Sequence, residues 1–372
     1  MKKASNMRVL LVSPALNLCG GIEKYLISYY RELHNQIDFT FVTHDATDKE
    51  YLEEITNNGD KVFVLSKISG KTFLKNYLEI ENFLKHNHDF DIIHCNMPNA
   101  AFIYLNLAKK YGIKVRIMHS HETKYADKLS HALRNKPLID IGKKYATNYL
   151  ACSVEAGKYF FGAKKYNVVK NCIDVDKFVF DYKVRKKIRN KLNLDDNDIL
   201  LGNVGRFVPA KNQMFLLNVF KKISMINSHF KLIIIGDGEL EEKIKSNVIN
   251  NALTDSVYIL NSQPNINEYM QAFDAFLLPS IYEGLGIVNI ESQASGLKTF
   301  VSTGVSREAE IDKKLIKFLP LDESIWTDEL LNCNFEYKRL NNKNKIAESG
   351  FSLSHNAKSL YVLYSNFLKE NK

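Results

Sequence analysis

Residues 199–205 read ILLGNVG, a short apolar run that ends on a glycine. Further runs of this kind follow it: KLIIIG from Lys231, VYIL from Val257, AFLLP from Ala275, TFVS from Thr299 and IKFL from Ile316. Short apolar runs rich in β-branched residues are typical of strands that are buried on both faces of a parallel sheet. Because stretches with helical spacing separate them, this part of the chain is predicted to form a doubly wound α/β sheet.

An earlier series of runs has the same character. It comprises RVLLVSP from Arg8, FTFVT from Phe39, KVFVL from Lys61, DIIHC from Asp91, KVRIMH from Lys114 and YLACS from Tyr149. Helical patterns, such as residues 23–33 and 73–85, lie between these runs. The charged segment 171–198 separates the two series, so we expect two Rossmann-like domains that face each other across a cleft. The expected divisions are residues 1–175, residues 176–355 and a final helix, 356–372, that returns to the first domain.

The net charge of the 372-residue chain, +9, is concentrated in one window. Residues 109–144 carry ten basic and three acidic side chains. Basic and apolar residues alternate between Lys124 and Lys144, as in stretches that lie on anionic membranes, although a solvated surface loop has the same composition. Nothing in the sequence resembles a nucleic-acid-binding motif. The five cysteines show no CxxC spacing, so a reducing cytoplasm is expected. No apolar run in the sequence is long enough to span a membrane.

The segment PSIYEGLGIVNIESQASG, residues 279–296, is the most informative for function. It follows a predicted strand and leads into a helix, with Gly284 and Gly286 in the turn. The first free N–H groups of such a helix form an anion site. Glu283 and Glu291 would accept hydrogen bonds from hydroxyl groups on either side of a bound phosphate. Together these features fit a sugar nucleotide, although acidic residues also stabilise a helix N-terminus by themselves.

The segment GRFVPAKN, which starts at Gly205, supplies positive charge at the end of another predicted strand. Arg206 offers phosphate a planar fork and Lys211 a compact charge. Both could stabilise a diphosphate leaving group.

These segments resemble glycosyltransferase family 4, a retaining family with the GT-B fold. The resemblance covers nearly the whole chain and rests on the E-x7-E motif from Glu283 to Glu291, on GRFVPAKN, GDGE at 236–239, NCIDVDKF at 171–178 and LCGGIEKY at 18–25. VSTGVSREAEI, from Val301, is similar to the bacterial exopolysaccharide and capsule branch.

The resemblance implies a role for each matching residue. Glu291 would hold the ribose, Gln263 would lie near the nucleobase, and the Gly20–Gly21 turn would approach the phosphate and the acceptor. Residues expected to bind the donor are Gly21, Gly205, Arg206, Lys211, Gln263, Glu283, Gly284, Leu285, Gly286, Ile287, Val288 and Glu291. Residues expected to act in catalysis are His121, Glu283, Arg206 and Lys211.

A histidine that follows a central strand of the first domain contacts the transferring sugar in this family. The sequence HSHE offers His119 and His121, and we favour His121 because His119 still fits the alternation of the strand. His94 is expected to be structural. The resemblance further implies a front-face substitution, in which the acceptor hydroxyl gives its proton to the departing phosphate. No metal and no cofactor are expected, because the resemblance requires neither and the sequence shows no clustered set of His, Cys and Asp ligands.

The predicted function is therefore a retaining hexosyltransferase that acts in the biosynthesis of cell-surface polysaccharide. It would move a hexose or an N-acetylhexosamine from a nucleotide sugar, preferably UDP-linked, to a saccharide or lipid-diphosphate-linked saccharide acceptor. The alternative is a sugar-nucleotide epimerase or a phosphorylase of the same fold. We expect a cytoplasmic protein that could be peripheral at the inner face of the plasma membrane through residues 109–144.

Overall fold

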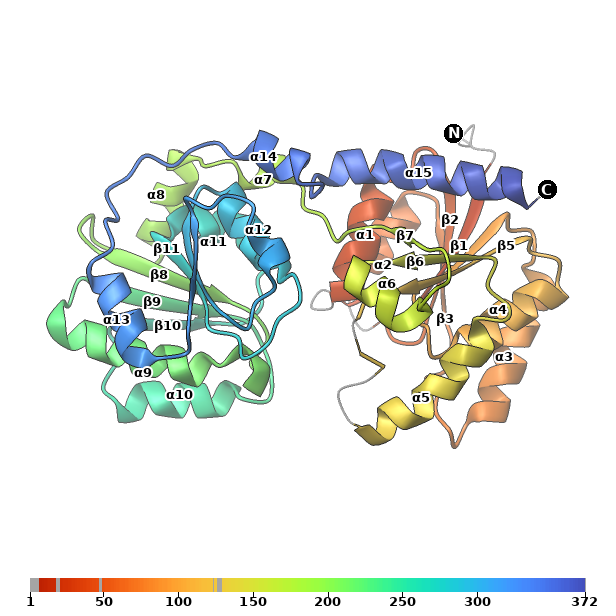
Figure 1. The fold of residues 1–372 in the computed structure, drawn as a ribbon, viewed down its shortest axis with the longest axis horizontal. Coiled ribbons are helices and arrows are strands. Elements are labelled where there is room, and N and C mark those ends of the chain that lie inside the picture. Colours follow the sequence, from red (N-terminus) through yellow and green to blue (C-terminus); the bar gives the residue numbers. More distant parts are fainter. Residues whose placement is uncertain (1–6, 18–20, 47–48, 123, 126–128, 372) are drawn as a thin grey trace. The chain divides into compact units, whose positions relative to one another are not determined.

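The computed structural model describes residues 7–17, 21–46, 49–122, 124–125 and 129–371 (Figure 1). The chain divides into two compact units. The first comprises Met1–Cys172 together with Leu353–Lys372, and the second comprises Ile173–Ser352. Each unit contains one fully parallel sheet, so the fold class expected from the sequence is correct. The acceptor and donor roles assigned to the two units stay a prediction.

The first unit is built on a seven-stranded sheet with the strand order β3-β2-β1-β4-β5-β6-β7. The strands are β1 (Arg8–Ser13), β2 (Asp38–Thr43), β3 (Lys61–Val64), β4 (Ile92–Cys95), β5 (Val115–Ser120), β6 (Asn148–Ala151) and β7 (Asn167–Val168). The strands other than the two-residue β7 match the runs in the sequence. Strand order reverses between β1 and β4, and ligands of open α/β sheets bind at the carboxyl ends of strands around such a reversal.

Helices cover both faces of this sheet. They are α1 (Gly21–Leu33), α2 (Lys49–Asn57), α3 (Phe73–His86), α4 (Ala101–Lys110), α5 (Leu129–Gly142), α6 (Val154–Phe161) and α15 (Leu353–Glu370). Val9 and Leu11 of β1 pack with α1, α2 and α15, whereas Leu10 and Val12 pack with α3, α4 and α6. Burial of both sets explains why the strand reads as a continuous apolar run. The C-terminal helix α15 therefore completes the core of the first unit.

The second unit repeats this design with the strand order β10-β9-β8-β11-β12-β13. Its strands are β8 (Ile199–Val204), β9 (Phe230–Ile235), β10 (Val257–Leu260), β11 (Ala275–Leu278), β12 (Lys298–Ser302) and β13 (Ile316–Leu319). Its helices are α7 (Val175–Phe178), α8 (Tyr182–Lys191), α9 (Gln213–Ile226), α10 (Glu241–Asn250), α11 (Ile266–Ala272), α12 (Ile287–Ala294), α13 (Glu323–Leu331) and α14 (Lys343–Glu348), with 3₁₀ turns η1 (Pro209–Lys211) and η2 (Arg307–Ala309). Here the order reverses between β8 and β11.

The basic run in segment 171–198 has a structural role. It forms α8, and the Arg185 and Arg189 guanidinium groups lie 2.6 Å and 3.2 Å from the carboxylate of Asp274. That carboxylate also accepts a hydrogen bond of 2.7 Å from the backbone N–H of Leu200. These contacts fix α8 to the sheet. From Ile173 onward, the segment that separates the two series in the sequence is thus part of the packed second unit.

Several basic side chains of the window 109–144 have hydrogen-bond or ion-pair partners within the first unit. The Arg116 guanidinium donates to three backbone carbonyl groups at 2.7–2.9 Å. On α5, the Asp140 carboxylate pairs with Lys143 at 2.8 Å and with Lys136 at 3.4 Å. Leu133 and Ile141 are exposed, whereas Ile139 is buried. No helix in the described ranges is both long and apolar enough to cross a membrane.

Candidate active site

Glycine at position 286 sets the start of α12. Gly286 is the N-cap of the helix and has φ +59°, a conformation that side chains disfavour. A Cβ atom there would lie 2.8 Å from Asn289 Nδ2 and 2.9 Å from Glu283 Cγ. The turn therefore holds the Glu283 side chain against the first turn of the helix. The N–H groups of Ile287 and Val288 in that turn have no acceptor within the helix, as at every helix N-terminus.

The backbone of Glu283 is held by the loop that follows β12. The Glu283 N–H donates to Gly304 O at 3.0 Å, and the Ser306 N–H donates to Glu283 O at 3.2 Å. Glu283 and Val305 form an isolated parallel bridge. This carboxylate is consequently placed by backbone contacts on both of its sides, which makes its position a property of the fold.

Lys211 lies on η1, in the loop after β8, and its ammonium group forms an ion pair with the Glu283 carboxylate. The side chains of the pair are only 17% and 19% exposed. The two loops are also joined by the hydrogen bond from the Ile281 N–H to Ala210 O, 2.8 Å long. The stem of Lys211 runs past Gly205, where an added Cβ would be 3.6 Å from its Cδ. The sites expected from GRFVPAKN and from the E-x7-E motif thus form one cluster where the strand order reverses.

Other expected donor residues lie on the same loops, on α12 and after β10. Arg206 is exposed, and its carbonyl oxygen accepts a 3.0 Å hydrogen bond from Gln213 Nε2. Glu291 lies on the second turn of α12 and is partly buried. Gln263 follows β10, at a greater distance along the sheet, and donates to Asn261 O at 2.9 Å. Leu285 packs against the apolar core of the second unit.

In the first unit, His121 follows the end of β5. Its Nε2 atom is 2.8 Å from Asn96 Oδ1, and its ring centroid is 4.0 Å from that of His119 and 4.8 Å from that of Tyr25. Burial lowers the pKa of His121 to about 3, which keeps the imidazole neutral at physiological pH. Gly21 is the first residue of α1, whereas its neighbour Gly20 lies outside the described residues.

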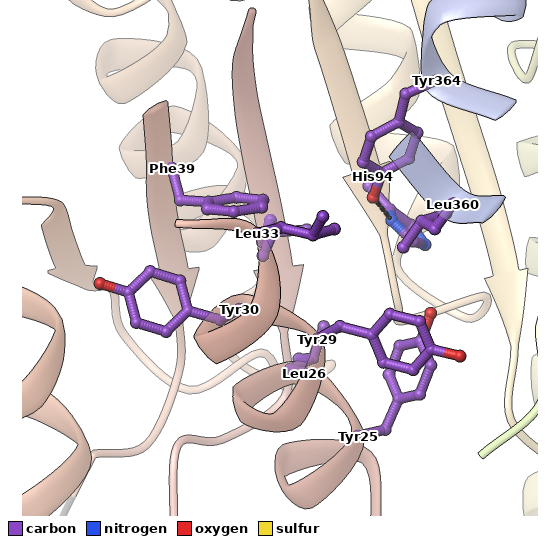
Figure 2. Close-up of a pocket in the computed structure, with 10 residues that line it drawn as sticks. Tyr25, Leu26, Tyr29, Tyr30, Leu33, Phe39, His94, Leu360 and Tyr364 are labelled. Carbon is purple, nitrogen blue, oxygen red and sulfur yellow. Dashed lines mark hydrogen bonds between the residues drawn. The ribbon is translucent and has the colours of Figure 1, made fainter. Parts of the chain in front are cut away.

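His119 and His94 form a buried series of hydrogen bonds that ends at Tyr364 on the C-terminal helix α15. His94 Nε2 is 2.9 Å from His119 Nδ1, and His94 Nδ1 is 2.6 Å from the Tyr364 hydroxyl of α15. Figure 2 shows this last contact beside a small cavity between α1 and α15. The cavity is lined by apolar and aromatic side chains, His94 apart, and belongs to the packing of α15. His119 is fully buried, in agreement with its place in the strand pattern.

The sequence reasoning did not select Asn96, which contacts His121. Asn96 comes directly after β4, beside the reversal of strand order in the first sheet. Asn96 could have been selected from the sequence because it is a polar residue immediately after a central buried strand. The sequence analysis used a comparable signal for the loop after β8, where the roles of Arg206 and Lys211 stay a prediction.

The two Rossmann-like units share one strand order, to which the first unit adds a seventh strand, and two such units are the architecture of the GT-B fold. Residues 19–177 match the family model Glycosyltransferase Family 4, and residues 184–316 match Glycosyl transferases group 1. Both models describe glycosyltransferases, so the chain belongs to the glycosyltransferases, with its N-terminal part matching family 4.

Individual relatives agree with this assignment. EpsF of Bacillus subtilis (strain 168), which is named as a glycosyltransferase, is 28% identical over 97% of this chain and 97% of its own. The UDP-Gal:alpha-D-GlcNAc-diphosphoundecaprenol alpha-1,3-galactosyltransferase of Escherichia coli is 24% identical over 93% of this chain and 94% of its own. The structure of Anabaena HepE in complex with UDP and glucose has a TM-score of 0.78 at 16% identity, covering 97% of this chain and all of that one, which shows the shared fold.

Proposed function

We propose that the protein is a retaining glycosyltransferase that transfers a hexose or an N-acetylhexosamine from a UDP-sugar to a lipid-diphosphate-linked saccharide. The observation that carries the proposal is the ion pair of Lys211 and Glu283 beside the N-terminus of α12. The names of the relatives support the substrate classes: the E. coli galactosyltransferase uses a UDP-sugar and a diphosphoundecaprenol acceptor by its name. By this analogy the product would enter a cell-surface polysaccharide.

The ion pair has a use in donor binding. Without a donor, each group neutralises the other at a site where both are largely shielded from water. An arriving diphosphate would offer Lys211 a stronger partner and so release the Glu283 carboxylate, which could then accept hydrogen bonds from sugar hydroxyls. The first N–H groups of α12 would bind the phosphate nearest to the sugar. Binding of the diphosphate and binding of the sugar would thereby be coupled through one pair of side chains.

The remaining donor contacts follow the family resemblance. Arg206, exposed next to the cluster, would contact the diphosphate from the side of solvent. Glu291 would hold the ribose, and Gln263 would lie near the uracil. Gly21 and His121 of the first unit would contact the acceptor and the transferring sugar.

In the proposed reaction, an acceptor hydroxyl attacks the anomeric carbon on the side of the leaving group. The bond from that carbon to the phosphate oxygen breaks, the new glycosidic bond forms, and the hydroxyl proton passes to the departing phosphate. The α-configuration of the sugar is thereby retained. Lys211, Arg206 and the N-terminus of α12 stabilise the negative charge on the UDP product, so the protein contributes mainly positioning and electrostatics. We expect this step to proceed in the presence of a metal chelator.

The experiment is a screen of nucleotide sugars in which released nucleotide diphosphate is measured with and without a lipid-diphosphate-linked saccharide. Release that requires the acceptor, together with an α-linked product, supports the proposal. Conversion of the nucleotide sugar to an epimer without any acceptor would instead establish the epimerase alternative. Cleavage of a saccharide by free phosphate, which breaks the glycosidic bond and forms a sugar phosphate, would establish the phosphorylase.

We also propose that the first unit binds an anionic membrane surface that carries the acceptor. Besides the basic window 109–144, α3 presents exposed leucines, Leu74 (69% exposed) and Leu78 (55%), on its outer side. Lys71 and Lys75, which are exposed beside them, add positive charge. Exposed leucines between lysines fit an interface in which apolar groups enter the lipid and ammonium groups remain at the phosphates.

A further inference from the structure

The carboxamide of Asn96 is held in one orientation by backbone groups. Asn96 is 1% exposed, and its backbone N–H donates to Val12 O at 2.9 Å. Its side-chain nitrogen, Nδ2, donates to Val12 O and to His94 O, both at 3.3 Å. Backbone carbonyl groups can only accept hydrogen bonds, so the amide nitrogen must face them and the amide oxygen must point the other way. The oxygen Oδ1 then lies 2.8 Å from Nε2 of His121.

The orientation of Asn96 determines where the proton of His121 resides. Asn96 Oδ1 carries only lone pairs, so Nε2 of His121 must be the donor in this contact. A neutral imidazole has one proton, and burial keeps this ring neutral, with a pKa of about 3. Nδ1 of His121 therefore has a free lone pair. That atom is buried and has no hydrogen-bond partner among the described residues.

We propose that Asn96 is a positioning residue that fixes the Nε2–H tautomer of His121, so that Nδ1 is an acceptor for a hydroxyl group of the substrate. The tautomer follows from the contacts of Asn96 and from the neutral state of the buried ring. The identity of the hydroxyl, as one belonging to the transferring sugar, rests on the proposed function.

The same reasoning separates His121 from His119. Nδ1 of His119 is bonded to His94, which is bonded in turn to the Tyr364 hydroxyl. A tyrosine hydroxyl can donate or accept, so donor and acceptor can be exchanged at each of these hydrogen bonds. They therefore do not decide whether Nε2 of His119 carries a proton. Only His121 of these two has a partner of fixed polarity. An acceptor site for a substrate hydroxyl is thus built at His121.

The test is a ¹⁵N spectrum of the full-length protein labelled at histidine, recorded by magic-angle spinning at neutral pH. The His121 signals are assigned by their loss in His121→Gln. We expect a protonated Nε2 and an unprotonated Nδ1 for His121. His44 provides an internal standard of the opposite kind, because its Nδ1 lies 2.8 Å from Ser66 O and must donate, while Nε2 lies 2.9 Å from the Tyr104 hydroxyl. A protonated Nδ1 at His121 in the wild-type protein would overturn the proposal without the need for any variant.

Asn96→Leu tests whether the asparagine causes the tautomer. This variant has a similar volume and removes the acceptor, so the preference of His121 for Nε2–H should be lost, while the His44 signals stay unchanged and report an intact fold. An unchanged His121 tautomer in Asn96→Leu would contradict the positioning role.

The kinetics of Asn96→Leu test whether Nδ1 of His121 binds a hydroxyl group of the substrate. We expect kcat/KM for the donor to fall by about tenfold to a hundredfold, because the acceptor atom is no longer held in place. Equal kinetics in Asn96→Leu and the wild type would refute the role in substrate binding. Absence of any sugar transfer, with the expected tautomer present in the spectrum, would refute the proposed function and leave the tautomer assignment standing.

Discussion

Lys211 and Glu283 lie 72 positions apart in the chain and form an ion pair that is shielded from water at the carboxyl ends of β8 and β11. Each residue is placed by its own loop, and the hydrogen bond between Ile281 and Ala210 joins the loops. The ion pair therefore joins GRFVPAKN and the E-x7-E motif, which are separate in the sequence, into one cluster.

The first prediction concerns this pair. Lys211→Ala should lower kcat by two to three orders of magnitude, about the effect of removing one preorganised group that stabilises a developing charge. The measurement is the rate of nucleotide diphosphate release at saturating donor and acceptor. Lys317→Ala is the matched control, because it breaks the exposed pair of Lys317 with Glu329, 2.6 Å long, in the same unit. Equal rates for Lys211→Ala and the control would exclude Lys211 from the active site.

The second prediction concerns the turn before α12. Gly286→Ala should lower the free energy of unfolding of the second unit by about 1–2 kcal/mol or more, because alanine is strained at positive φ and its Cβ would press on Glu283 and Asn289. Gly284→Ala is the control, since a Cβ at Gly284 meets no atom within 4 Å. Urea unfolding of both variants gives the comparison. A stability equal to that of Gly284→Ala would show that the turn relaxes without cost.

The third prediction concerns acid stability. Burial lowers the pKa of His94 and His121 to about 3 each, and lowers that of His119 as well. Unfolded histidines titrate near pH 6.5, so below that pH the unfolded chain binds more protons than the folded one. The stability of the first unit should therefore be fully present above about pH 6.5. It should fall by up to about 1.4 kcal/mol per histidine for each pH unit below it.

Thermal or urea unfolding of the first unit, measured between pH 7 and pH 5, checks this dependence. His119→Leu should make the decline less steep, since one group leaves the titration. His86→Gln, which replaces an exposed histidine at the end of α3, controls for the substitution itself. A slope that is the same in His119→Leu and the wild type would contradict the explanation.

The fourth prediction concerns the membrane surface. Leu74→Ser combined with Leu78→Ser should reduce flotation with liposomes that contain anionic lipid, because these leucines are the most exposed large apolar residues of α3. Met225→Ser, at an 80% exposed position of the second unit, should have no effect. Liposomes without anionic lipid should bind the wild type less, since the lysines contribute through charge. Equal flotation of the wild type on anionic and neutral liposomes would rule out the proposed surface.

Much of the fold could be predicted because strands buried on both faces leave a direct record in the sequence. The runs from Arg8, Ile199 and Ala275 became β1, β8 and β11 within one residue of the expected start. The edge strand β7 left no record, because it has two residues and neither is fully buried. Segment 171–198 was expected to separate the two sheets, yet its basic residues make specific contacts with Asp274 that no local pattern reveals.

The sequence by itself determined the fold class, the family and the motif residues around Glu283 and Lys211. These features depend on local composition, on hydrophobic spacing and on short motifs, all of which are readable along the chain. Only the tertiary structure decided that Lys211 pairs with Glu283, that α15 contacts His94 through Tyr364, and that Asn96 orients His121. The physical reason is that a hydrogen bond depends on distance and direction between residues that only the folded sheet brings together.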